Sequence, residues 1–117
     1  MAREVKRSFI IPEPMNGKVK IIFTDEMPTS ISKIAPDETG LNDIAAYCND
    51  EVPGLPVIVL TFDASLDDIV HESDHAAFCL LAGMGIPVTN TDNEAHAYLI
   101  GFVVGKILKL QAKINAD

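Results

Sequence analysis

No run of apolar residues in this chain of 117 residues reaches the length, about 18 residues, that a membrane-spanning helix needs. The charged opening, residues 1–7, is not followed by the apolar segment of a secretory signal peptide. The only two cysteines, Cys48 and Cys79, form no C-x-x-C pair. These absences exclude a cysteine-rich zinc site and a secreted disulfide scaffold, and they predict a cytoplasmic protein with no membrane contact.

Basic residues are scarce in the middle of the sequence. Residues 21–100 contain fourteen carboxylates and one base, Lys33, for a charge of −13, whereas residues 1–20 carry +3 and residues 101–117 carry +2. Binding to a phosphate backbone needs a basic face, so the net charge of −8 predicts no nucleic-acid partner. An acidic middle favours solubility, and it attracts divalent cations and basic peptide segments.

Apolar and β-branched segments in the first half of the chain predict a small sheet. Residues 9–11 and 19–23 flank Asn16-Gly17, which is a hairpin signal. The continuous apolar run at 57–62 predicts the strongest strand, and residues 44–48 would pair with it as a second hairpin if they too are extended. Between the hairpins, residues 30–35 indicate at most one helical turn.

Helical spacing of apolar residues dominates the second half. Residues 65–68 resemble a capping box, and the pattern behind it predicts a helix over about 66–82 that ends at Gly83 and Gly85. A second helix is predicted over about 92–113, with lysines near its end.

The expected fold class is therefore α+β. Hydrophobic residues make up 48% and charged residues 22% of the chain, which is typical of one folded domain spanning 1–117. Strands lie mainly within 1–62 and form a small, mostly antiparallel sheet, and two antiparallel helices follow it.

The predicted helix 66–82 contains an H-E-x-x-H motif, His71-Glu72-Ser73-Asp74-His75. Four residues slightly exceed one helical turn, so His71 and His75 project from the same face and can share one metal ion at about 2.0–2.1 Å. Glu72 points about 100° around the axis, where it can reach a metal-bound water without binding the metal. The metal lowers the pKa of that water to about 7, and Glu72 can take its proton as the water attacks a carbonyl.

A zinc hydrolase needs a third protein ligand and an open fourth position. The candidates in this sequence are Glu94, His96, Asp92 and Cys79. Glu94 begins the second helix, which the short connection would place beside His75. His96 faces the opposite side of that helix, which favours an exposed or hydrogen-bonded histidine, while Cys79 favours core packing.

Two local questions at the start of the second helix stay open. If Thr91 is the N-cap, Glu94 is its capping-box partner, whereas Asp92 as the N-cap leaves Glu94 free to bind metal. Tyr98 lies one turn after Glu94 on the same face, where it can hydrogen-bond a ligand or an oxyanion, or can pack with its hydroxyl satisfied.

His71-Glu72-x-x-His75 followed by Glu94-Ala95-His96-Ala97-Tyr98 resembles the short gluzincin metallopeptidases, minimal relatives of the thermolysin type that bacteriophages and prophages often encode. The resemblance covers about residues 55–108. It implies a zincin-like core, zinc held by His71, His75 and Glu94, and Glu72 as general base, with Tyr98 in place of the aspartate that often follows the glutamate ligand. It also implies that a peptide aligns along the strand at 57–62.

The function expected from these patterns is zinc-dependent hydrolysis of a peptide or protein substrate, with Glu72 as the general base and Tyr98 as a second catalytic candidate. The alternative is a catalytically weak, zinc-stabilised binding or inhibitor protein that acts through its acidic face. The sequence does not indicate whether the protein is a monomer or an oligomer.

Overall fold

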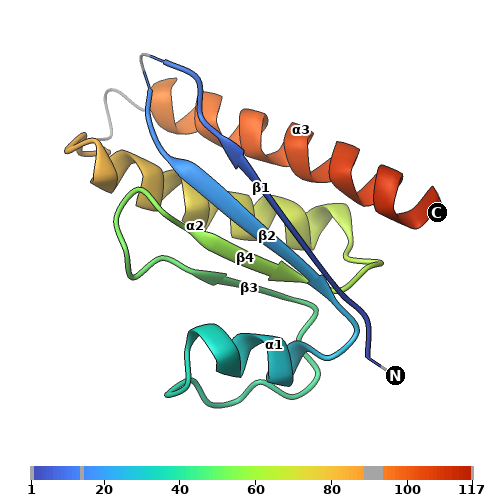
Figure 1. The fold of residues 1–117 in the computed structure, drawn as a ribbon. Helices are drawn as coiled ribbons and strands as arrows, with labels where there is room; N and C mark the ends of the chain where they lie inside the picture. Colours follow the sequence, from blue (N-terminus) through green and yellow to red (C-terminus); the bar gives the residue numbers. More distant parts are fainter. Residues whose placement is uncertain (1, 14, 89–93, 117) are drawn as a thin grey trace.

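The computed structural model describes residues 2–13, 15–88 and 94–116. In Figure 1 a twisted sheet is covered along one face by two long helices. In chain order the elements are β1 (Glu4–Ile10), β2 (Lys18–Thr24), α1 (Met27–Ile34), β3 (Ala46–Asn49), β4 (Val57–Leu60), α2 (Leu66–Gly83) and α3 (Glu94–Ala116). The fold is α+β, as the sequence predicts.

The strands form one mixed sheet with the order β1-β2-β4-β3. β1 pairs with β2 and β3 pairs with β4 in antiparallel fashion, but the central strands β2 and β4 are parallel. The prediction of a mostly antiparallel sheet is therefore wrong at the centre of the sheet. After β2 the chain passes through α1 to the far edge, forms β3 there and returns as β4 in the direction of β2, as a parallel pair requires.

Both predicted hairpins are present. β1 and β2 pair from Glu4↔Thr24 to Ile10↔Lys18, and Gly17 in their connection has a φ of 142°, a conformation that favours glycine. β3 and β4 pair with Cys48 opposite Ile58, so the segment at 44–48 contributes a strand.

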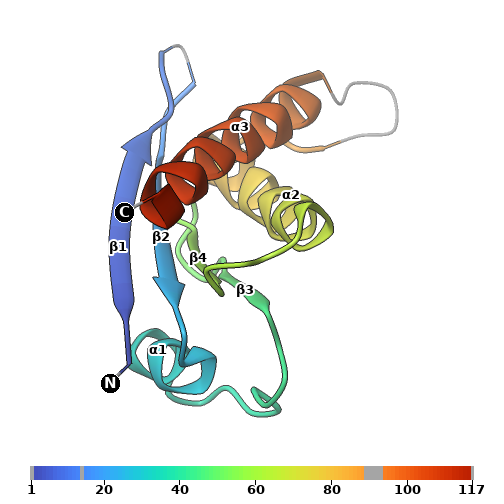
Figure 2. The same ribbon diagram turned by 90° about the vertical axis from the view of Figure 1, so that its right-hand side faces the viewer.

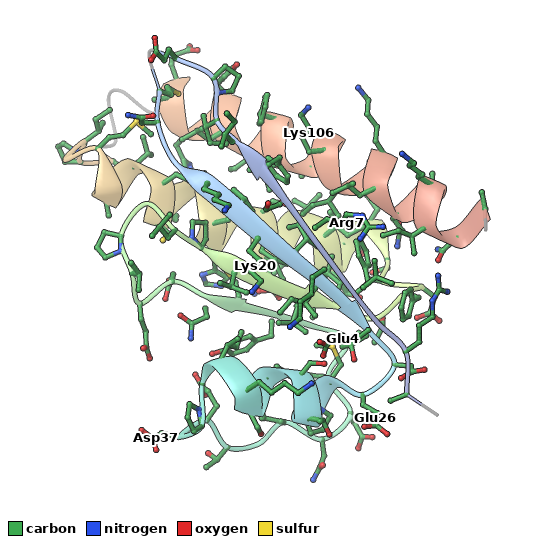
Figure 3. All side chains as sticks on the ribbon, viewed as in Figure 1. Glu4, Arg7, Lys20, Glu26, Asp37 and Lys106 are labelled. Atoms are coloured by element: carbon green, nitrogen blue, oxygen red, sulfur yellow. The ribbon has the colours of Figure 1, made fainter. Side chains whose placement is uncertain are left out.

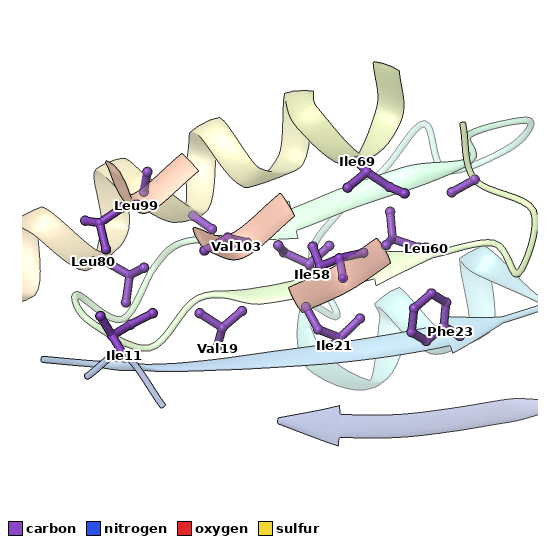
Figure 4. Packing of buried hydrophobic residues seen from close by; sticks show 14 of the residues in the cluster. Ile11, Val19, Ile21, Phe23, Ile58, Leu60, Ile69, Leu80, Leu99 and Val103 are labelled. Atoms are coloured by element: carbon purple, nitrogen blue, oxygen red, sulfur yellow. The ribbon is translucent and has the colours of Figure 1, made fainter. Parts of the chain in front are cut away.

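The two faces of the sheet bury different clusters, because successive residues of a strand point to opposite sides. Ile21 and Ile58 face α2 and α3 in the main core, part of which Figure 4 shows at close range. Ile22 and Val59 face the other way and pack against Ile31 of α1. α1, a full helix where the sequence indicated one turn, thus covers part of the second face, as the edge-on view of Figure 2 illustrates.

The capping box predicted at the start of α2 is confirmed. The Asp68 amide donates to Ser65 Oγ at 3.1 Å, and the Ser65 amide donates to Asp68 Oδ2 at 3.3 Å. α2 and α3 lie side by side and run in opposite directions in both ribbon views. α3 extends three residues beyond its predicted end, while its predicted first residues, 92–93, lie outside the described part of the chain. No helix in the described residues is both long and apolar enough to span a bilayer.

Candidate metal centre

One turn of α2 carries the H-E-x-x-H motif, and the two histidines of the motif lie on the side turned away from the core. Ile69, Ala76 and Leu80 of this helix are completely buried and fix its orientation on the sheet. His71 and His75 lie on the opposite side and are exposed to solvent. The helical period that buries one set of residues therefore presents both imidazoles on the surface.

The donor atoms of His71, Glu72 and His75 all lie within 4.8 Å of one another. The two imidazole rings have centroids 5.0 Å apart and an interplanar angle of 72°. Ligands of one tetrahedral zinc ion at about 2.0–2.1 Å are about 3.4 Å apart, so donor atoms that lie within 4.8 Å of one another need to approach by at most about 1.4 Å. Rotation of two exposed side chains supplies a movement of that size, and the donor set fits a divalent metal.

Glu72 occupies a different environment from the two histidines. Only 7% of the residue is exposed, and burial raises the pKa of its carboxyl, while His71 and His75 lower it by a smaller effect. Burial, and then the charge of Glu72, raise the pKa of the Cys48 thiol on β3. Glu72 therefore lies on a buried side of α2, a helix that contacts β3.

Glu94 does not belong to the group formed by His71, Glu72 and His75. It is the first residue of α3 and is exposed. The alternative candidate Asp92, and the N-cap choice between it and Thr91, lie outside the described residues. Glu94 as the third ligand stays a prediction.

His96 faces α2, with Nε2 2.9 Å from Asp74 Oδ1 and its ring 4.2 Å from that of Phe78. His96 therefore lies beside a carboxylate of α2 and outside the group of His71, Glu72 and His75. The sequence did not predict the pairing with Asp74. Asp74 lies about 100° from His75 around α2, on the side where a neighbouring helix packs. This offset could have indicated that Asp74 has a partner on the second helix.

The two other candidates, Cys79 and Tyr98, contact other parts of the structure. Cys79 is buried, and its thiol lies 3.2 Å from the carbonyl oxygen of Val52, in agreement with the expected core packing. Tyr98 is half exposed, and its nearest aromatic partner is Phe102, 6.2 Å away. Phe102 in turn lies 6.0 Å from Phe9, which places Tyr98 on the β1 side of α3.

The strand that was expected to align a peptide is not at an edge. β4 has β2 on one side and β3 on the other, so its backbone groups are already paired. The expectation for residues 57–62 is therefore wrong. The free edge on the side of Glu72 belongs to β3.

Comparison of the chain with protein-family models, with curated proteins and with solved structures finds no match.

Proposed function

We propose that this protein binds one zinc ion through His71 and His75 and hydrolyses peptide bonds beside it. The observation that supports the proposal most directly is the separation of roles within one helical turn. Two exposed imidazoles lie next to a buried carboxylate, with all donor atoms within 4.8 Å. Glu94 is the proposed third ligand, and we expect the protein to act in the cytoplasm.

A bound zinc ion supplies Lewis acidity, which polarises a substrate carbonyl and acidifies a nearby water. The chain's own part is to accept and deliver protons. Glu72 is buried enough for its pKa to be raised, which brings the carboxylate closer to the range in which a general base works near neutral pH. It takes the proton of the attacking water and then donates a proton to the leaving amine.

An extended peptide has one available strand on this side of the sheet. β3 is an edge strand that contacts α2, and the backbone groups on its outer edge can pair with an added strand. The acidic residues Asp67, Asp68 and Asp74 on the same helix favour substrates with basic side chains.

Metal content tests the first half of the proposal. We expect the purified chain, after incubation with zinc and removal of free metal, to retain about one equivalent by atomic spectroscopy. His71→Ala with His75→Ala should abolish binding, and His96→Gln should leave it unchanged because His96 pairs with Asp74. Less than about a tenth of an equivalent in the unaltered protein rules the metal site out.

Glu72→Gln tests the catalytic half. Removal of the base should lower peptide hydrolysis by roughly 100-fold or more while zinc binding persists, since Glu72 is not a ligand in this scheme. The measurement is cleavage of a fluorogenic peptide library by the zinc-loaded protein, with Glu51→Gln as a control acid on an exposed loop. Equal turnover by Glu72→Gln and the unaltered protein excludes Glu72 as the base.

A zinc-stabilised binding protein is the second candidate. The solvent exposure of both histidines, and the absence of Glu94 from their group, favour this function over a closed catalytic cleft. Such a protein would show no peptide cleavage with zinc bound, and Glu72→Gln would leave its partner binding intact.

A further inference from the structure

The outer face of the β1–β2 hairpin carries a cluster of cations in a chain whose net charge is −8. The face away from α2 and α3 is covered by α1 only in part. On the uncovered part there is a shallow cavity of about 430 Å³, which is lined by Lys6, Arg7, Ser8, Lys18 and Lys20. Figure 3 shows Lys20 at the centre of this face and Arg7 along the edge strand.

The register of the hairpin places Ser8 among three lysines. Ser8 is the Cα partner of Lys20, so their side chains stand next to each other on one face. Lys6 precedes Ser8 by two residues and Lys18 precedes Lys20 by two, and residues two apart on a strand share a face about 6.6 Å from each other. One hydroxyl and three ammonium groups therefore converge on the same small area.

Most of this positive charge is not neutralised by the protein. Glu4 lies 3.5 Å from Lys6, but it also lies 3.5 Å from Lys33 and accepts a hydrogen bond from Ser30 at 2.5 Å. In the described residues no carboxylate lies within 4.0 Å of Arg7, Lys18 or Lys20. Arg7 alternates with Lys6 and Ser8 and is the Cα partner of Ile21, so the outer face itself carries three lysines, which with Glu4 leave a local charge of +2.

The surroundings limit the size of an anion that fits. Beyond the cluster the sheet leads to α1 and the loop after it, where Asp37, Glu38 and Glu51 line another cavity. Figure 3 shows Asp37 and Glu26 at that end of the molecule, away from Lys20. At physiological salt, charges more than about 8 Å apart are largely screened from each other. A compact anion in the cavity is therefore attracted by the lysines and is little affected by the distant carboxylates. A long polyanion lying along the sheet would also meet the carboxylates.

We propose that this cavity, here called the hairpin cradle (Lys6, Arg7, Ser8, Lys18 and Lys20), binds a compact oligophosphate, a small molecule with two or more linked phosphoryl groups. Lysine ammonium groups donate to phosphate oxygens as mobile point charges, and the Ser8 hydroxyl adds a short-range donor between them. The hairpin cradle lies on the opposite face of the sheet from His71 and His75, so the proposal does not depend on the metal site.

Titration calorimetry with inorganic tripolyphosphate tests the hairpin cradle, in buffer treated to remove divalent metals. The test variant is Lys18→Gln with Lys20→Gln. The control is Lys109→Gln with Lys113→Gln on α3, which removes the same net charge at another place. We expect the first pair to weaken binding at least about tenfold and the control to change it less than about twofold. Thermal unfolding of each variant verifies that the hairpin remains folded.

Four results would overturn the proposal. The first is the absence of binding heat from tripolyphosphate at millimolar concentration. The second is equal weakening of binding by the two pairs of substitutions, which would show that the loss of affinity comes from the change in net charge. The third is equal affinity for orthophosphate, because linked phosphoryl groups would then be unnecessary. The fourth is tighter binding of a short single-stranded oligonucleotide or of anionic phospholipid vesicles at equal phosphate concentration, with the same dependence on Lys18 and Lys20. That result would assign the cradle to a polymer or a membrane surface.

Discussion

His71, Glu72 and His75 show how neighbouring residues in one helical turn acquire different chemistry. The helix turns about 100° per residue, so the step from His71 to Glu72 is enough to move a side chain from solvent to a buried position. An exposed imidazole can rotate to meet an ion, whereas a buried carboxyl has less freedom to move and has a raised pKa. The division between ligand and base follows from burial.

Ser30 connects α1 to the two strands of the first hairpin. It is buried, its hydroxyl lies 2.8 Å from that of Thr24, and it donates to Glu4 at 2.5 Å. Ser30→Ala leaves the Thr24 hydroxyl buried without this partner and should lower the free energy of unfolding by about 1–3 kcal/mol. Chemical denaturation measures the change, with the exposed Ser32→Ala as control for helix propensity.

The effect of Ser30→Ala should depend on pH. The hydrogen bond from Ser30 is the largest cause that lowers the pKa of Glu4 below its ordinary value of 4.5. A group with a lowered pKa in the folded state stabilises the fold above its unfolded pKa and loses that contribution as pH falls through the folded pKa. The stability difference between the two proteins should therefore be largest at neutral pH and shrink below about pH 4. A difference that stays constant with pH would contradict the role of Glu4.

At the scale of elements, the end of α2 packs closely against the loop before β4. A Cβ atom added to Gly83 would lie 2.6 Å from the backbone nitrogen of Gly54 and 3.0 Å from the carbonyl carbon of Pro53. The Gly54 amide also donates to the Cys79 carbonyl at 2.9 Å, so the loop cannot move without losing a hydrogen bond.

Gly83→Ala should therefore lower the free energy of unfolding by at least about 2 kcal/mol, because backbone atoms must separate. Gly101→Ala is the matched control. It lies inside α3 with no heavy atom within 4 Å of an added Cβ, and alanine there should stabilise the protein by about 0.5–1 kcal/mol. Melting temperatures that fall equally in both variants would show that the close contact between Gly83 and Gly54 does not determine the loss of stability.

The elements that the sequence predicts well are those with local causes. The capping residues Ser65 and Asp68 mark the start of α2, and the helical period places the two histidines of the motif, without reference to the rest of the chain. The parallel pairing of β2 with β4 depends on how α1 carries the chain across the sheet, and no local pattern encodes that route. Whether Glu94 can reach the histidines depends in the same way on the path between α2 and α3.

At the scale of the whole molecule, total charge and local charge lead to different conclusions. The net charge of −8 argues against nucleic-acid binding, yet five of the nine basic residues lie within residues 1–20. Folding of the first hairpin gathers four of these five at one cavity, while the carboxylates of the middle segment lie elsewhere. A sum over the chain cannot show this separation, which only the strand register creates.

The parallel pairing at the centre of the sheet also has a consequence for how the chain folds. Each hairpin closes a short loop, but contacts such as Ile21 with Ile58 join segments that are far apart in the sequence. The entropy of closing that long loop must be lost before β2 and β4 can gain their contacts. Non-local pairings of this kind slow folding, so we expect docking of the two preformed hairpins to limit its rate.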